Sequence, residues 1–177
     1  MFQYQNEIEG KYYFIIEMGK SQFLRKEILG HLQKKRPGWM ETRSVEDCDV
    51  ILVFCPIVSR AGTDIDAALN DLNTCSEFKQ AIFIVSHQTF DPEKVIPDSS
   101  GYVTRRNTLT VDCLFNEDNG LLKCKINDVA LTKVVRLFKP QKQNPFDGKI
   151  IFFIFVGSVG LLYLSYRYLK VRISQRV

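Results

Sequence analysis

Two short stretches of this sequence consist almost entirely of apolar residues, and they constrain the fold more than any other feature. They are DVILVFC at 49–55 and AIFIVS at 81–86. A strand with one face in water alternates apolar and polar residues, whereas a strand covered on both faces of a parallel sheet has a continuous apolar run. The chain is therefore expected to contain a parallel sheet with other elements packed on both of its faces.

Strand and helix patterns alternate along residues 1–138. Runs rich in β-branched and aromatic residues predict further strands, at 11–18, 39–43 and 108–115. Apolar residues at three- and four-residue steps predict helices, at 21–36, 63–75 and 127–138. Pro56 is expected to end the strand at 49–55, and residues 87–107 are expected to form a long loop. This order predicts an α/β three-layer sandwich with a mostly parallel sheet of five strands.

A run without a single charged residue, IIFFIFVGSVGLLYLSY, fills positions 150–166. At about 1.5 Å per residue, an α-helix from 150 to 169 is about 30 Å long, which matches the hydrocarbon core of a bilayer. A core helix of a soluble domain needs only one apolar stripe, whereas apolar residues occupy every side of this segment. The sequence therefore predicts a head domain, a linker, a transmembrane helix and a basic tail, at 1–138, 139–149, 150–169 and 170–177.

The charges of the chain are distributed unevenly. All the acidic residues lie at or before Asp147, while five basic residues flank or follow the apolar run, so the net charge of +4 arises there. The head domain is nearly neutral and has no basic patch pattern, which argues against a nucleic-acid partner. The basic tail is expected to meet membrane lipid.

Three features indicate the side of the membrane on which the head lies. The first ten residues, MFQYQNEIEG, have neither a basic start nor an apolar core, so they do not resemble a secretory signal. The five cysteines are scattered without a CxxC pair, as is typical of reduced thiols in a cytosolic domain. Few residues follow the apolar run. Together these features predict a tail-anchored, single-pass protein with a cytosolic head, in the mitochondrial outer membrane or the endoplasmic reticulum.

The tripeptide Gly19-Lys20-Ser21 stands between the first predicted strand and the first predicted helix. A P-loop needs the pattern G-x-x-x-x-G-K-[ST], and the residue five positions before Gly19 is Phe14. An anion could still bind at the helix start beside Lys20, so the tripeptide is a candidate ligand-binding site. The interpretation we favour is a tight turn in which Ser21 caps the helix.

The segment CDVILVFCPIVSRAGTDIDAALNDL places Gly62 and Thr63 shortly before Asp66. It resembles the nucleoside deoxyribosyltransferase-like superfamily, whose flavodoxin-like members carry the pattern D-x-G-T-x-x-E-x-G-x-A at this place. The resemblance implies a flavodoxin-like fold, a ligand site at Gly62 and Thr63, and Asp66 in the position of the nucleophilic glutamate. This sequence has Arg60 in place of the first aspartate of the pattern and Ala68 in place of its second glycine.

A carboxylate at a helix start, above the ends of parallel strands, could attack or stabilise a ribosyl group. His87 follows the fourth predicted strand, where it could serve Asp66 as an acid/base partner. The spacing Thr63-x-x-Asp66 also predicts a capping box, which needs no substrate and which we favour. Two histidines and scattered cysteines predict no metal site, and no cofactor is expected.

Two broader resemblances bear on function. The alternation of strands and helices resembles the TIR-type signalling fold, in which the head contacts a copy of itself or a partner. The phrases VEDCDVILVFCPIVSRAGTDI, FDPEKVIPDSS and TLTVDCLFNEDNGLLKC resemble a family of uncharacterised proteins expanded in fishes, and that resemblance implies no activity. We therefore expect a binding or signalling module for a protein partner, for self-association or for a nucleotide-like ligand. The alternative is a nucleotide N-glycosidic-bond hydrolase or transferase that uses Asp66.

Overall fold

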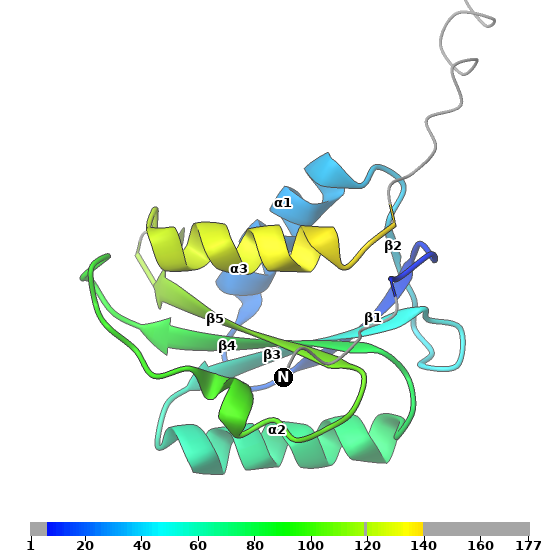
Figure 1. The fold of residues 1–177 in the computed structure, drawn as a ribbon, viewed down its shortest axis with the longest axis horizontal. Helices are drawn as coiled ribbons and strands as arrows, with labels where there is room; N and C mark the ends of the chain where they lie inside the picture. Colours follow the sequence, from blue (N-terminus) through cyan, green and yellow to red (C-terminus); the bar gives the residue numbers. More distant parts are fainter. Residues whose placement is uncertain (1–6, 119, 140–177) are drawn as a thin grey trace, which may run out of the picture. The chain divides into compact units, whose positions relative to one another are not determined.

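The computed structural model describes residues 7–118 and 120–139, which form one mixed sheet with helices on both faces (Figure 1). The strands are β1 (Tyr12–Glu17), β2 (Met40–Glu41), β3 (Val50–Ile57), β4 (Ala81–Gln88), β5 (Thr108–Asn116) and β6 (Gly120–Leu121). The helices are α1 (Gln22–Lys35), α2 (Ala61–Cys75) and α3 (Lys125–Arg136), and a 3₁₀ turn, η1, spans Ser99–Gly101. The strand order is β2-β1-β3-β4-β5-β6, in which β1 to β5 are parallel and β6 is antiparallel. The prediction of an α/β fold with a mostly parallel sheet is confirmed.

The two apolar runs form the centre of the sheet, where β3 and β4 lie side by side. Alternate residues of these strands serve opposite faces. Leu52 and Ile84 pack into the core beneath α1 and α3, whereas Val53 and Phe83 pack against α2. Burying one such side chain completely contributes about 1.5–3 kcal/mol to folding. Both faces of these strands are therefore covered, which explains why the runs lack polar residues.

The prediction that Pro56 ends the third strand is wrong, because β3 continues through Pro56 to Ile57. The amide of Met18 donates to the Phe54 carbonyl at 3.0 Å, so the even-numbered residues of β3 face β1. The nitrogen of Pro56 therefore points beyond the end of β1. Proline is tolerated there because no neighbouring strand needs its missing N–H.

Two predictions about the β4–β5 half of the sheet are also corrected. The sheet of the described residues has six strands rather than five, since β6 pairs with Phe115 and Asn116. A two-residue strand is too short to leave a recognisable pattern. The long loop begins after Gln88 instead of at His87, because both residues continue β4 and pair with β5.

Residues 89–107, which we call the crossing segment, pass over the face of the sheet that α2 covers and carry η1 (Figure 1). A helix usually makes such a connection between parallel strands. Here the buried guanidinium of Arg105 fastens the segment, donating to the carbonyls of Ser76 at 2.9 Å and Lys79 at 2.7 Å. Because Ser76 is the residue at which α2 ends, the cation also complements the negative end of that helix.

The two ends of the described chain are joined to each other. Ile8 forms a parallel bridge with Phe138. The buried Arg36 donates to the carbonyls of Gly10 at 2.8 Å and Lys139 at 2.9 Å, and its guanidinium lies 4.8 Å from the centre of the Phe138 ring. The described chain therefore ends, at residue 139, against the residues that precede β1.

Within 7–118 and 120–139, no helix is both long enough and apolar enough to cross a bilayer. The predicted transmembrane helix at 150–169 lies outside the described residues, as do the basic tail at 170–177 and all but the first residue of the linker at 139–149. By its internal contacts the chain divides into two units, residues 1–140 and 141–177.

Candidate functional site

Ligands of open parallel sheets bind at the carboxyl ends of the strands, near the point where the strand order reverses. In this sheet the order reverses between β1 and β3. The loops that follow β1 and β3 are therefore the first place to look for a site. Gly19, Lys20 and Ser21 lie in the turn after β1, whereas Gly62, Thr63 and Asp66 lie in the first turns of α2, which follows the loop after β3. His87 lies in β4.

Gly19, Lys20 and Ser21 form the turn from β1 to α1. Gly19 has a φ of +57°, a left-handed conformation that favours glycine. Lys20 is exposed, whereas Ser21 is buried. Ser21 is the N-cap residue of α1, as predicted, but its side chain makes no capping hydrogen bond to the helix. Its hydroxyl instead donates to Glu17 Oε1 at 2.9 Å.

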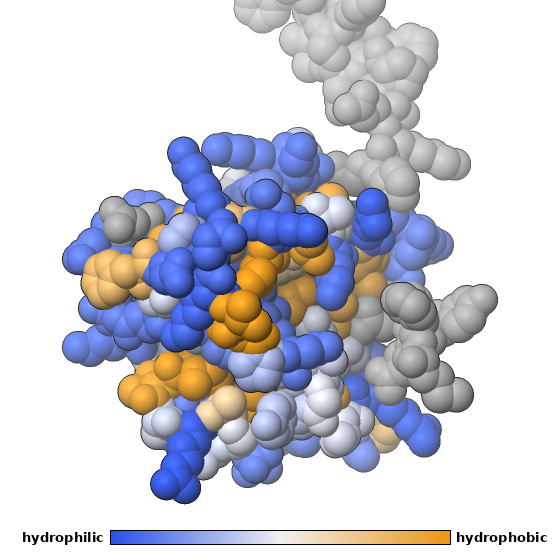
Figure 2. All heavy atoms as spheres, turned by 60° about the vertical axis from the view of Figure 1, so that its left-hand side comes forward, coloured by the Kyte–Doolittle hydropathy of each residue, from blue (hydrophilic) through white to orange (hydrophobic). Residues whose placement is uncertain are grey.

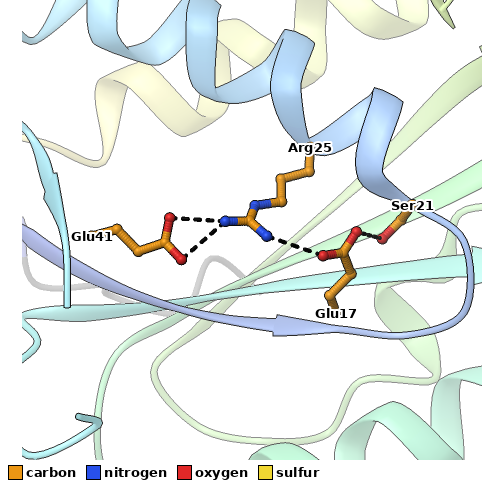
Figure 3. A network of polar contacts seen from close by, with 4 residues as sticks. All are labelled: Glu17, Ser21, Arg25 and Glu41. Atoms are coloured by element: carbon orange, nitrogen blue, oxygen red, sulfur yellow. Dashed lines mark hydrogen bonds and ion pairs between the residues drawn. The ribbon is translucent and has the colours of Figure 1, made fainter. Parts of the chain in front are cut away.

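Glu17 belongs to a network that closes this turn (Figure 3). Arg25 Nη1 donates to Glu17 Oε2 at 3.2 Å, and Arg25 Nη2 donates to both carboxylate oxygens of Glu41 at 2.9 Å. The network joins the end of β1 to α1 and β2. The Glu17 carboxylate therefore lies beside Ser21 at the start of α1, and its negative charge opposes phosphate binding there.

α2 begins at Ala61, two residues before the predicted start, and Arg60 is its N-cap residue. Thr63 therefore lies inside the helix, and the predicted capping box is wrong. The loop after β3 is held by Asp64, whose Oδ2 accepts the amides of Val58 at 2.8 Å and Ser59 at 2.9 Å. Burial by itself would raise the pKa of Asp64, but these hydrogen bonds outweigh it and lower the pKa.

Asp66 is exposed on α2, one turn after Gly62. Gly62 faces the crossing segment, since a Cβ built on it would lie 4.0 Å from Cε1 of Tyr102. No hydrogen bond or ion pair of the described residues joins Asp66 to His87. The turn at 19–21 follows β1, and the first turn of α2 follows the loop after β3. No direct bond between their predicted ligand-binding residues is found among the described residues.

His87 lies within β4, where it is buried and has a partner that the sequence did not predict. Its Nε2 lies 2.9 Å from Oδ1 of Asp112 on β5. The other oxygen, Oδ2, accepts the amide of Ser99 at 3.0 Å. Burial by itself would raise the pKa of Asp112, but the hydrogen bonds from His87 and Ser99 outweigh it and lower the pKa. The only sequence signal for this pair is one carboxylate within the apolar run VDCLF.

Two buried thiols, Cys55 and Cys113, lie near these residues. Burial, with the charge of Asp64, raises the pKa of Cys55 to about 12, and burial, with the charge of Asp112, raises the pKa of Cys113 to about 12. Both therefore stay protonated at neutral pH. Among the described residues, no group of three or more His, Cys, Asp or Glu side chains is placed to hold a metal ion.

Apolar side chains are exposed at the end of the molecule where the parallel strands end. Figure 2 shows the side of the molecule toward which β3, β4 and β5 run, with apolar patches between polar side chains. The loops that follow β3 and β4 contribute Val58, Phe90 and Val95, which are 82%, 74% and 91% exposed. The carboxylates of Glu17, Asp64 and Asp112 are bound by donors of the same domain, whereas these apolar side chains face solvent. Comparison of the chain with protein-family models, curated proteins and solved structures found no match.

Proposed function

We propose that this protein is a single-pass membrane protein whose head domain binds a protein partner. One observation carries the proposal. The carboxylates of Glu17, Asp64 and Asp112 are each bound by donors of the same domain, while apolar side chains at the same end are exposed. A site for a polar small molecule presents free polar groups to it, whereas exposed apolar side chains are typical of surfaces that bind proteins.

The strand order supports a flavodoxin-like head. Flavodoxin-like sheets have the order 2-1-3-4-5, and β1 to β5 follow this order with β6 added at one edge. Two helices on one face and one helix with the crossing segment on the other would form the outer layers of the sandwich. Such folds serve many functions, so the proposed binding role rests on the surface described above and not on the fold.

The apolar run supports the membrane part of the proposal. A helix at 150–169 would anchor the protein, the basic residues that follow would meet lipid headgroups, and the head would lie in the cytosol at the mitochondrial outer membrane or the endoplasmic reticulum. Cells expressing the full chain or a chain ending at residue 149 test this. Alkaline carbonate should leave the full chain in the membrane pellet and the shorter chain in solution. A full chain released by carbonate would contradict the anchor.

The enzyme alternative predicts turnover, and the binding proposal predicts none. The purified full chain, incubated with a panel of nucleosides, nucleotides and dinucleotides, should release no free base by liquid chromatography. Asp66→Asn serves as the control, because turnover by a catalytic Asp66 would disappear in this variant. Base release that depends on Asp66 would overturn the binding proposal in favour of a nucleotide N-glycosidic-bond enzyme.

A further inference from the structure

We infer that the open edge of β5 is a docking site for an extended, acidic and apolar peptide segment of a partner protein, which adds to the sheet as a further strand. This inference rests on the proposed binding function and gives it a surface and a partner chemistry. Strand addition obtains affinity from main-chain hydrogen bonds and specificity from the alternating side chains of the peptide.

Most of the outer edge of β5 has no strand beside it among the described residues. β6 pairs only with Phe115 and Asn116. The side chain of Asn127 covers the next position, because it accepts the amide of Leu114 at 2.7 Å and donates to the Leu114 carbonyl at 2.8 Å. The remaining positions of the edge, before Leu114, are open to a partner.

The main-chain groups of this open part point outward. The carbonyls of Asn107 and Phe115 accept the amides of Ala81 and Thr89, so the odd-numbered residues of this stretch face β4. Successive residues of a strand point their N–H and C=O groups to opposite sides. Those of Thr110 and Asp112 therefore face away from β4 and are available to an added strand.

A groove of about 340 Å³ follows this edge. One wall is formed by Ile126 and Val129 of α3, and the other by Ile96 and Pro97 of the crossing segment. These walls lie on opposite faces of the sheet, so they can line one groove only where the sheet ends. A peptide strand lying there would direct its alternate side chains to the two walls.

Two lysines on the α3 side of the groove offer charge partners to an acidic peptide. Lys125 and Lys133 of α3 line the groove, and neither forms an ion pair with a described residue. The two carboxylates that line it are already bound, Asp112 by His87 and Ser99, and Asp98 by the amide of Ser100.

The spacing of the lysines defines the peptide further. Eight helical residues span about 12 Å, and four strand residues span about 13 Å. Acidic residues four positions apart would therefore meet Lys125 and Lys133. An apolar residue midway between them would meet Val129, whose side chain is 44% exposed.

A second copy of this chain fits the edge less well than a single peptide. Among the helices, α3 is the one that packs against β5. Paired strands lie about 4.8 Å apart, whereas packed helices need about 8–10 Å. Two copies joined through β5 would therefore force their α3 helices together, and an isolated strand brings no helix.

The test uses the full chain in detergent micelles and a fluorescein-labelled peptide, GTETVTETG, which has the required spacing. Fluorescence anisotropy should show saturable binding. The peptide GTETPTETG should not bind, because proline disrupts the added strand, and GTKTVTKTG should not bind, because its charge matches that of the lysines. Amide hydrogen exchange should show new protection at Thr110 and Asp112.

Variants of the groove complete the test. The double change Lys125→Glu and Lys133→Glu should weaken binding of GTETVTETG about tenfold or more and allow GTKTVTKTG to bind. Lys34→Glu with Lys35→Glu makes the same charge change on exposed residues of α1 and should leave binding unaltered. The inference is overturned if GTETVTETG does not bind, if Thr110 and Asp112 gain no protection, or if the groove variant binds like the wild type.

These results are separable from the proposed function. Absence of peptide binding, in a chain that resists carbonate extraction and releases no base, rejects the β5 site and leaves the membrane-bound binding module standing. Asp66-dependent base release rejects the binding module itself.

Discussion

The imidazole of His87 and the carboxylate of Asp112 face each other across β4 and β5, with 2.9 Å between Nε2 and Oδ1. Their side chains are only 10% and 14% exposed. Since Asp112 also accepts the amide of Ser99, one carboxylate joins two strands to the crossing segment. His87 is thus engaged with a neighbouring strand, where the sequence suggested a partnership with Asp66.

This pair predicts how stability depends on pH. The pKa of Asp112 is lower in the folded chain than its ordinary value, so its contribution to stability is present above the unfolded pKa and is lost as the pH falls through the folded pKa. The wild type should lose stability below about pH 4. Asp112→Asn should be about 1–3 kcal/mol less stable at neutral pH, with a flatter acid limb. Urea unfolding of the wild type and of Asp112→Asn, each as a chain ending at residue 149, at several pH values measures the stability difference and its pH dependence. If the free energies of unfolding of the two proteins changed in parallel with pH, that would contradict the role of Asp112.

Arg105 and Arg106 offer a matched pair at the end of the crossing segment. Arg105 is buried and donates to the hydroxyl of Thr108 and to the carbonyls of Ser76, Lys79 and Arg106, whereas Arg106 is exposed. Arg105→Met should cost at least about 2 kcal/mol, because it leaves buried carbonyls without a donor. Arg106→Met should change the free energy of unfolding by less than about 0.5 kcal/mol. Thermal and urea unfolding measure the stability of the two variants. An equal loss of stability in both would show that Arg105 does not hold the crossing segment in place.

Two glycines should respond to alanine in opposite directions. Gly30 lies in the middle of α1, and a Cβ built there meets nothing within 4 Å, so Gly30→Ala should stabilise the fold by about 0.5–1 kcal/mol. Gly19 has a positive φ, so Gly19→Ala should destabilise by about 1–2 kcal/mol. The midpoints of urea unfolding give both values. A stabilising Gly19→Ala would mean that the turn after β1 can adopt another conformation.

The central strands could be predicted because burial on both faces leaves a continuous apolar run in β3 and β4. The boundaries of the strands could not be predicted. Pro56 is allowed in β3 only because β1 ends beside it, and this depends on tertiary structure that the local sequence does not encode. β6 could not be predicted because two residues are too few to show the alternating apolar and polar pattern of a strand. The candidate site differed from prediction for a related reason. Ser21 bonds to Glu17, and His87 to Asp112, through contacts that the local spacing of residues does not encode.

At the start of α2, Asp64 has a structural role, whereas the sequence predicted a capping or catalytic role for Asp66. Asp64 accepts three hydrogen bonds from Val58 and Ser59, so it holds the loop after β3 and sets the start of α2 two residues earlier than the sequence suggested. Asp64→Asn weakens these charge-assisted bonds and should cost about 1 kcal/mol. Asp66 is exposed, so Asp66→Asn should stay within about 0.5 kcal/mol.

Urea unfolding of the two variants, with the nucleotide panel run on both, separates the outcomes. The expected result is a stability loss confined to Asp64→Asn and no base release by either variant or by the wild type. A capping role for Asp66 would instead make Asp66→Asn the more costly change, because the first turn of α2 would lose an acceptor. A catalytic role would leave stability unaltered and abolish a turnover that the wild type possesses. In the structure Asp66 is exposed on α2 and forms no hydrogen bond or ion pair with the described residues.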